Sequence, residues 1–322
     1  MFQDFKESAR LLFGGEPRKP APGDYSEAAR RLHEQKRRDP NRRQEIEAVR
    51  GHPRSHKWRN RRWAVLIAMN LLFVVSFRLD IQLLEGALTA SRFLGFHMAD
   101  LNSALLVMLA HKHIIVNLLI GTLTVFLAWV LLGGRSFCSW LCPYHLLGEW
   151  AEQLHLYLVG KKKVKEHVFH RGTRTVLWAL FALISFATGY TVFETLSPTG
   201  ILSRALIYGP GLALLWVFAL LLFEIFYSRR AWCRYGCPIG LTYGVVGLIS
   251  PLVVRYRLDS CAHEGDCRKV CPVPHVLDCV IKGRATGTEM DIGADCYRCG
   301  LCVDICPSGA LKFDVKGLSR LR

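Results

Sequence analysis

The sequence is short of acidic side chains. It has 26 Asp and Glu against 42 Lys and Arg among 322 residues, which gives a formal charge of +16. Such an excess suits a nucleic-acid partner, an anionic membrane surface or the cytoplasmic loops of a membrane protein, and only its distribution separates these classes. The first residues also lack a short apolar run followed by a small-residue cleavage site. We therefore expect no signal peptide and no export of the start of the chain.

The cysteines lack the even scatter of a secreted disulfide scaffold. There are twelve, and they fall in close pairs and quartets between residues 138 and 306. Close grouping of this kind indicates metal ligation by thiols that are kept reduced.

Long apolar runs are present, and 51% of all residues are hydrophobic. Four runs cover residues 63–79, 114–132, 176–193 and 212–227. Each has roughly the length that a helix needs to cross a hydrocarbon core of about 30 Å. Buried core helices would need amphipathic partners to cover them, and so short a chain has none to spare. We predict four membrane-spanning helices with polar loops between them.

The basic residues lie on alternate sides of these runs. Residues 1–62 carry seventeen Lys and Arg against nine Asp and Glu, and we expect a mostly solvated cytoplasmic tail there. Within it, the stretches Phe2–Phe13 and Tyr25–Arg37 are each suited to a short amphipathic helix. The 133–174 and 229–257 segments carry seven and five Lys and Arg, whereas the 80–113 and 194–210 loops carry two and one. The positive-inside rule then places both termini in the cytoplasm. Because topology accounts for the charge, we expect no nucleic-acid partner.

An internal repeat joins the ends of the second and fourth runs. Cys138 and Cys142 form a Cys-x-x-x-Cys-Pro motif, and Cys233 and Cys237 form another at an offset of 95 residues. Each proline suits the first turn of a new helix, so the second cysteine of each pair should lie beside a helix N-terminus that favours thiolate. Two such units would pack around a pseudo-two-fold axis. We interpret the four thiols as an additional redox or metal site, and whether they bind metal, form disulfides or stay free is left open.

The strongest motif is Cys296-x-x-Cys299-x-x-Cys302-x-x-x-Cys306-Pro307. In a two-cluster ferredoxin domain, three cysteines at this spacing bind one cubane cluster and the fourth reaches the other cluster. Upstream, Cys261, Cys267 and Cys271 keep the same frame, but Glu264 takes the place of the second cysteine. One 4Fe-4S cluster is therefore assigned to Cys271, Cys296, Cys299 and Cys302.

The second cluster has three assigned ligands, Cys261, Cys267 and Cys306. Its fourth ligand is Cys279, Glu264 or nothing, and the last case gives a 3Fe-4S cluster. We favour Cys279, the only spare thiol of the domain, because thiolate is a softer ligand than carboxylate and suits iron–sulfur clusters better.

These patterns give the fold class. We predict an α-helical membrane protein with four transmembrane helices and a two-fold internal repeat, followed by an α+β domain like bacterial ferredoxin. The predicted divisions are a basic tail over 1–62, a membrane domain over 63–257 and a ferredoxin-like iron–sulfur domain over 258–322.

Together these segments resemble the NapH/MauN family of polytopic ferredoxin-type proteins, membrane components of periplasmic respiratory systems. The similar blocks outside the ferredoxin motifs are Trp58-x-x-Arg61-Arg62, Gly133-Gly134-Arg135-x-Phe137-Cys138-x-Trp140-x-Cys142-Pro143, Phe193-Glu194-x-x-Ser197-Pro198 and Ser228-Arg229-Arg230-x-Trp232-Cys233-x-x-x-Cys237-Pro238. The likeness covers about residues 55–315, and Glu264 departs from the family's usual cysteine.

The resemblance implies a multi-pass protein of the bacterial inner membrane with both termini cytoplasmic. It also implies an enzyme-linked role, that of a quinol dehydrogenase subunit. Such a subunit takes electrons from the quinone pool and passes them to a periplasmic ferredoxin or c-type cytochrome and its terminal oxidoreductase. Some relatives are instead implicated in maturation, so a redox-linked assembly factor for a periplasmic metalloenzyme or quinoprotein is the alternative.

Quinol oxidation needs an apolar slot and a proton acceptor within hydrogen-bond reach. The candidates at the outer side are Asp100, His111 and Glu194. Glu224 lies inside the fourth run, where a carboxylate is costly and indicates either function or pairing with the nearby Arg229. His111 and His113 are two residues apart and cannot share a helix face, which argues against a haem.

Overall fold

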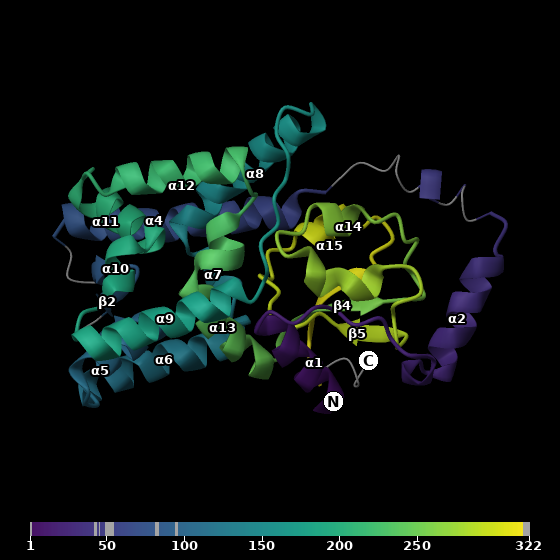
Figure 1. Cartoon of the computed structure of the whole chain (residues 1–322), viewed down its shortest axis with the longest axis horizontal. Coiled ribbons are helices and arrows are strands. Elements are labelled where there is room, and N and C mark those ends of the chain that lie inside the picture. Colours follow the sequence, from purple (N-terminus) through teal and green to yellow (C-terminus); the bar gives the residue numbers. More distant parts are fainter. Residues whose placement is uncertain are drawn as a thin grey trace.

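Two lobes make up the computed structural model, a helical lobe and a smaller lobe built around a short sheet (Figure 1). The structure describes residues 2–41, 44, 46–48, 55–80, 84–93 and 96–317. The end of the predicted ferredoxin-like domain, residues 318–322, lies outside these ranges. The helical lobe corresponds to the predicted membrane domain, and the sheet lobe contains the two ferredoxin motifs.

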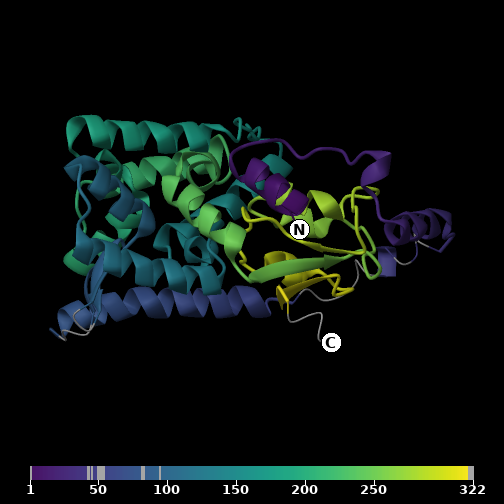
Figure 2. The same cartoon turned by 90° about the horizontal axis from the view of Figure 1, so that it is seen from below.

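All four predicted apolar runs are helical. The helices are α4 (Lys57–Arg78), α6 (Val116–Leu132), α9 (Thr173–Thr188) and α12 (Leu214–Phe226). The runs contain no proline and are rich in Leu and Ala, which favour the helix. Among the described helices, α4 alone is long and apolar enough to cross a membrane by length and composition, and the other three are apolar but shorter. Figure 2 shows α4 running the length of the helical lobe to the sheet lobe.

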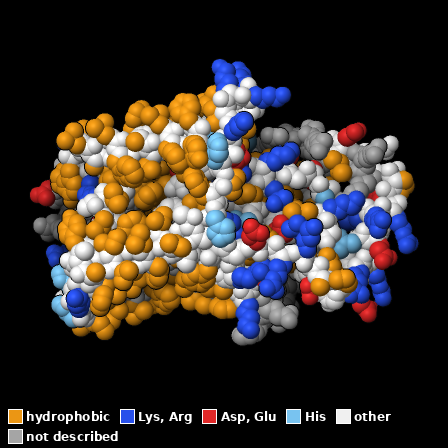
Figure 3. All heavy atoms as spheres, in the orientation of Figure 1, with side chains coloured by type: hydrophobic (Ala, Val, Ile, Leu, Met, Phe, Trp, Pro, Cys, Tyr) orange, Lys and Arg blue, Asp and Glu red, His pale blue; other side chains and the backbone are white. Residues whose placement is uncertain are grey.

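The four helices turn apolar side chains outward. Leu71, Leu123, Leu183 and Phe218 are 54%, 54%, 63% and 60% exposed, one on each helix. In Figure 3, hydrophobic side chains cover the helical lobe, while Lys and Arg gather over the sheet lobe and the boundary between the lobes. A contiguous apolar surface of this extent marks a contact with lipid or with another protein.

The segments between the apolar runs contain more structure than the loops that we expected. A three-stranded antiparallel meander follows α4, formed by β1 (Leu84–Ala87), β2 (Ala90–Phe93) and β3 (Phe96–Ala99). Three short helices accompany it, α5 (Leu101–His111), α10 (Val192–Leu196) and α11 (Pro198–Tyr208). Together these elements lie at the end of the helical lobe that faces away from the sheet lobe (Figure 1).

The end of the helical lobe near the sheet lobe is built from the two repeated motifs. The first gives α7 (Ser136–Trp140) and α8 (Pro143–Gly160), and the second gives the π-helical turn η2 (Trp232–Gly236) and α13 (Pro238–Ile249). Pro143 and Pro238 each occupy the first turn of a new helix. The local prediction from the Cys-x-x-x-Cys-Pro repeat is therefore confirmed.

The sheet lobe is antiparallel. Its strands are β4 (Leu252–Arg257), β5 (Glu289–Asp291) and β6 (Leu311–Val315), in the order β5-β4-β6. Its helical segments are α14 (Asp266–Lys269), the 3₁₀ segment η3 (Pro274–Val280) and α15 (Leu301–Ile305). The central strand β4 begins before the predicted domain boundary at residue 258, and Val254 and Tyr256 on it are fully buried in the core of this lobe.

The N-terminal segment forms helices over the two stretches where short amphipathic helices were expected, but it docks on the rest of the protein instead of remaining mostly solvated. It forms η1 (Pro22–Asp24) and the helices α1 (Phe2–Leu12) and α2 (Glu27–Arg38). Leu12 and Ala29 are fully buried, the latter in the core of the sheet lobe. The Arg174 guanidinium donates to the Leu12 carbonyl at 2.8 Å, and Lys36 Nζ donates to the Cys261 carbonyl at 2.6 Å. The two helices therefore pack on the rest of the protein through a few apolar side chains, such as Leu12 and Ala29, and through hydrogen bonds such as that of Lys36.

A buried carboxylate joins the two lobes. Asp295, in the sheet lobe, forms ion pairs with Arg135 and Arg174 of the helical lobe, the latter at 2.8 Å. It also accepts a hydrogen bond from His275 Nε2 at 2.7 Å. Burial alone would raise the pKa of Asp295, but the two arginines outweigh burial and hold that pKa below its ordinary range. The charge pairs therefore fasten the sheet lobe to the end of the helical lobe.

Candidate metal centre

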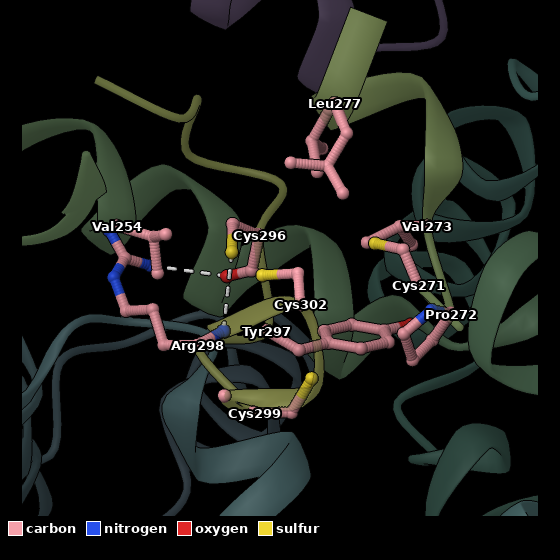
Figure 4. A pocket seen from close by; sticks show the side chains of 12 residues that line it. Val254, Cys271, Pro272, Val273, Leu277, Cys296, Tyr297, Arg298, Cys299 and Cys302 are labelled. Atoms are coloured by element: carbon pink, nitrogen blue, oxygen red, sulfur yellow. Dashed lines mark hydrogen bonds between the residues drawn. The ribbon is translucent and has the colours of Figure 1, made fainter. Parts of the chain in front are cut away.

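Four cysteines line one cavity in the sheet lobe. They are the four assigned to the first cluster, Cys271, Cys296, Cys299 and Cys302. Cys296 and Cys299 lie on the loop before α15, Cys302 lies on α15, and Cys271 follows α14. Figure 4 shows their sulfur atoms around the same space, with Leu277 and Val273 beside them. The four cysteines assigned to the first cluster thus line one cavity, and their ligation of a cluster stays a prediction from the chemistry of the ligands.

The backbone of the loop explains how three closely spaced cysteines reach one cavity. Arg298 and Gly300 have positive φ values of 51° and 78°, and these two left-handed residues turn the chain on either side of Cys299. The Arg298 N–H donates to Cys296 Sγ at 3.4 Å. A side chain at Gly300 would bring its Cβ within 2.5 Å of Trp58 Cβ, so the close approach of α4 requires glycine there.

The site fits an iron–sulfur cluster by its chemistry. All four cysteines are buried, and burial raises the pKa of Cys299 to about 11. Thiolates are not stable in such surroundings unless a cationic group compensates them. A cluster bound by these thiolates supplies that charge and carries single electrons.

The second set of predicted ligands also meets in the sheet lobe. Cys261, Cys267 and Cys279 are packed in its core, with Cys306 at the end of α15. Burial, together with the charges of Cys261, Cys306 and Glu264, raises the pKa of Cys267 to about 12. Burial likewise raises the pKa of Cys279 to about 12, with added contributions from Asp278, Cys267 and Cys261. Both candidates for the fourth ligand thus lie near the same thiols.

No three His, Cys, Asp or Glu side chains converge on the position of a single metal ion within the described ranges. A cluster differs from a single ion in this respect, because each ligand binds a separate iron atom.

The four cysteines of the repeat lie at the junction of the lobes. Cys138 is on α7 and Cys233 is on η2, whereas Cys142 and Cys237 are the N-cap residues of α8 and α13. Burial raises the pKa of Cys138 to about 12, and the charges of Cys237 and Cys142 also act on it. The structure therefore brings members of both repeated pairs into one another's electrostatic range, with all four as free thiols.

The first cluster loop is hydrogen-bonded to both repeated motifs. Ser139 Oγ donates to the Tyr297 carbonyl at 2.7 Å, and Trp140 Nε1 donates to the Arg298 carbonyl at 3.1 Å. From the other side, the Tyr297 hydroxyl donates to the Cys233 carbonyl at 3.0 Å. Sequence reasoning missed these residues, since non-ligating residues between cysteines carry no signal of a partner more than sixty positions away.

The outer quinol candidates separate into two groups. Asp100 is buried at the start of α5, and Ser103 Oγ donates both to its carboxylate, at 3.3 Å, and to Glu194. Burial raises the pKa of Asp100 to about 6. His111 lies exposed at the other end of α5, with its ring centroid 6.1 Å from that of His113. The structure thus joins Asp100 to Glu194 and leaves His111 apart from them.

Glu224 lies on α12 at the end of the helical lobe near the sheet lobe, and it is fully buried. Its carboxylate accepts a hydrogen bond from the Trp232 N–H at 3.0 Å. In the part of the chain that the structure describes, Arg229 pairs with Glu152 and Glu166 and makes no ion pair with Glu224. Glu224 is therefore not paired with Arg229, but the charge of the adjacent Arg230 acts on its carboxylate, so an arginine partner at this helix end remains an alternative to a functional role.

Two family models match the chain, and both are described as a 4Fe-4S binding domain. One matches residues 114–165 and 209–255, which contain the two Cys-x-x-x-Cys-Pro motifs. The other matches residues 294–312, which contain the Cys296–Cys306 motif. The Cys261–Cys271 motif lies between these ranges.

Characterised relatives match most of the chain. It is 31% identical to the methylamine utilization ferredoxin-type protein MauN of Methylorubrum extorquens, over 84% of the chain and 94% of that protein. It is 30% identical to the ferredoxin-type protein NapH of Escherichia coli, over 77% of the chain and 88% of the relative. A MauN protein of Paracoccus denitrificans is 33% identical, with 77% and 87% covered. No solved structure matches the chain significantly.

Proposed function

Because the chain belongs to the family of ferredoxin-type iron–sulfur electron-transfer proteins that includes NapH and MauN, we propose that it is the membrane subunit of a quinol dehydrogenase. In this proposal the protein holds two 4Fe-4S clusters on the cytoplasmic side of the bacterial inner membrane. It takes electrons from the quinone pool and serves a periplasmic ferredoxin or c-type cytochrome and its terminal oxidoreductase.

The outward apolar surface supports a multi-pass arrangement. Four helices, α4, α6, α9 and α12, expose Leu, Val and Phe side chains that would be costly in water. Their backbone groups are paired within each helix, which a lipid environment requires. The proposed topology has four spans with both termini cytoplasmic, since the Lys and Arg residues gather at the sheet-lobe end (Figure 3). The helices α6, α9 and α12 are shorter than a full span. In this proposal the residues just before and after each of them complete the crossing of the membrane.

One observation carries the proposed electron route, namely the direct contact between the first cluster loop and both cysteine pairs. Tyr297 stands between Cys296 and Cys299 in sequence, and its hydroxyl is hydrogen-bonded to the carbonyl of Cys233. Ser139, between Cys138 and Cys142, is hydrogen-bonded to the same tyrosine's carbonyl. The repeated motifs thus form the end of the helical lobe that contacts the first cluster loop, and this position supports their role as a relay.

Glu224 is our preferred proton acceptor for the quinol. Its carboxylate is held by the backbone N–H of Trp232, the residue next to Cys233, so a proton acceptor and a thiol of the relay lie side by side. The Asp100–Glu194 group at the outer end is the second candidate site, because it also combines a buried carboxylate with a polar neighbour.

The test is reduction of the detergent-solubilised protein by a short-chain quinol under anaerobic conditions, followed by the bleaching of the visible iron–sulfur absorption. We expect bleaching in the wild type and at least ~100-fold slower bleaching in Glu224→Gln, which is the low end of what a general base contributes. Glu166→Gln, at a half-exposed carboxylate that pairs with Arg229, is the matched control and should behave as wild type. Clusters that dithionite reduces and quinol does not would contradict the proposal.

The assembly-factor alternative predicts another pattern. In that case Cys138→Ser combined with Cys233→Ser would leave quinol-driven bleaching intact but abolish maturation of a periplasmic enzyme.

A further inference from the structure

The two ferredoxin motifs have left-handed residues at the same two positions of the loop. The first loop runs from Cys296 to Cys302 and the second from Cys261 to Cys267, each over seven residues. The third residue is left-handed in both, with φ 51° at Arg298 and 58° at His263. The fifth residue is a left-handed glycine in both, with φ 78° at Gly300 and 84° at Gly265.

The hydrogen bonds of the two loops repeat as well. The N–H of the third residue donates to the first cysteine's Sγ, at 3.4 Å for Arg298 and 3.3 Å for His263. A short helix then follows each glycine, α15 in one loop and α14 in the other. Because the backbones correspond, the fourth residue occupies the same place in both loops. That residue is Cys299 in the first loop and Glu264 in the second.

The Glu264 side chain is placed as a ligand would be. Its Oε2 atom is buried and has no hydrogen-bond partner among the residues that the structure describes. Its charge acts on Cys261 and Cys267, the flanking thiols of the same loop. A buried carboxylate oxygen without a partner costs free energy, and a cation beside it removes that cost.

The neighbouring histidine does not compete for this place. His263 Nδ1 is hydrogen-bonded to the Val280 carbonyl at 2.9 Å, which ties the loop to η3. Cys279 comes from η3, outside the repeated loop, and no position of the first site corresponds to it. The first site takes three ligands from its own loop and Cys271 from the other motif. The same rule gives the second site Cys261, Glu264, Cys267 and Cys306.

We propose that the Glu264 carboxylate is the fourth ligand of the second 4Fe-4S cluster, so that one of its irons is bound by oxygen and three by thiolate. The sequence favoured Cys279 because thiolate is the softer ligand, whereas the geometry of the loop favours Glu264. The inference rests on the second cluster of the proposed function. Its consequence is a single iron bound more weakly than the rest, because carboxylate is a harder ligand than thiolate.

The experiment compares full-length protein carrying C279S with the double variant C279S/E264Q, purified anaerobically in detergent. Iron is counted per chain, and EPR spectra are recorded after mild oxidation. We expect about eight irons in wild type and in C279S, from two four-iron clusters, and about seven in C279S/E264Q, with the EPR signal of an oxidised three-iron cluster. C279S/D259N is the matched control and should keep about eight, because Asp259 is an exposed carboxylate near the loop that pairs with Arg257.

Three results would overturn the inference. A C279S variant with about seven irons would make Cys279 the ligand. A double variant that keeps all its iron would leave the carboxylate without a role, and a three-iron cluster in wild type would show that the fourth position is empty. Failure of quinol reduction with these iron counts as expected would instead count against the proposed function alone.

Discussion

Replacing Asp295 by Asn should loosen the sheet lobe from the helical lobe. The side chains of Asp295, Arg135 and Arg174 are 3%, 1% and 4% exposed. His275 Nε2 and, at 3.9 Å, the Arg171 guanidinium also face this carboxylate. Removal of one partner from a buried charge pair costs about 3–5 kcal/mol, because the remaining charge is left without compensation. At roughly 2 °C per kcal/mol for a chain of this size, the melting temperature should fall by ~6–10 °C.

The assay is thermal loss of the visible iron–sulfur absorption in detergent, at a fixed heating rate. Asp291→Asn is the matched control, since it also removes a carboxylate from an arginine, at 2.9 Å, but at a side chain that is 34% exposed. In that variant Arg255 still has its ion pair with Asp314, at 2.8 Å. The loss in the free energy of unfolding should therefore stay below about 1 kcal/mol. Equal losses of stability in the two variants would refute the role that we give to the buried junction.

Three further predictions follow from the same contacts. Acidification should destabilise the wild type more than Asp295→Asn. The arginines hold the folded pKa of Asp295 below the unfolded value of about 3.9, so its contribution is fully present above that pH and declines progressively as the pH falls from there toward the folded pKa. Parallel melting curves between pH 6 and about pH 3 would argue against this. Gly300→Ala should lower the iron content, because the new Cβ would lie 2.5 Å from Trp58 Cβ. Gly265→Ala is the control, since Gly265 also has a positive φ, of +84°, but faces open space. That variant should lose only about 1–2 kcal/mol in the free energy of unfolding and should keep its iron. Asp304→Ala should lower the free energy of unfolding by about 1 kcal/mol. The Asp304 carboxylate accepts hydrogen bonds from the N–H groups of Trp58 and Arg59 at the start of α4, at 3.1 and 3.0 Å. An unchanged melting temperature would mean that other acceptors replace the carboxylate.

Most of the structure that the sequence predicted correctly follows from patterns among residues that are close together in the chain. The apolar runs, the prolines after Cys142 and Cys237 and the ferredoxin spacing each involve residues within about twenty positions, and all of them gave the expected helices or loops. The assignment of Cys271 to the first site reaches further, but it follows from the two-cluster rule and not from proximity.

Long-range contacts are where sequence reasoning fell short. Asp295 pairs with arginines more than a hundred positions away, and a single acidic residue beside a cysteine gives no sign of this. The N-terminal segment was expected to be mostly solvated because it is rich in charge and broken by prolines, yet Leu12 is buried against Gly244 of α13 and Arg174 donates to the Leu12 carbonyl. Burial of one or two side chains leaves no periodic pattern to detect.

The ligand at position 264 illustrates the same limit within a motif. Ligand softness argues for Cys279, whereas backbone conformation argues for Glu264, and only a structure shows that His263 and Gly265 repeat the turns of Arg298 and Gly300. The proposed ligand therefore depends on dihedral angles that no spacing rule contains.

The most direct test of the account is the count of iron and acid-labile sulfide in the full-length protein, purified from membranes in detergent without exposure to air. Two four-iron clusters predict about eight of each per chain. Iron-free protein, or about four of each with the Cys261–Cys267 loop unoccupied, would contradict it.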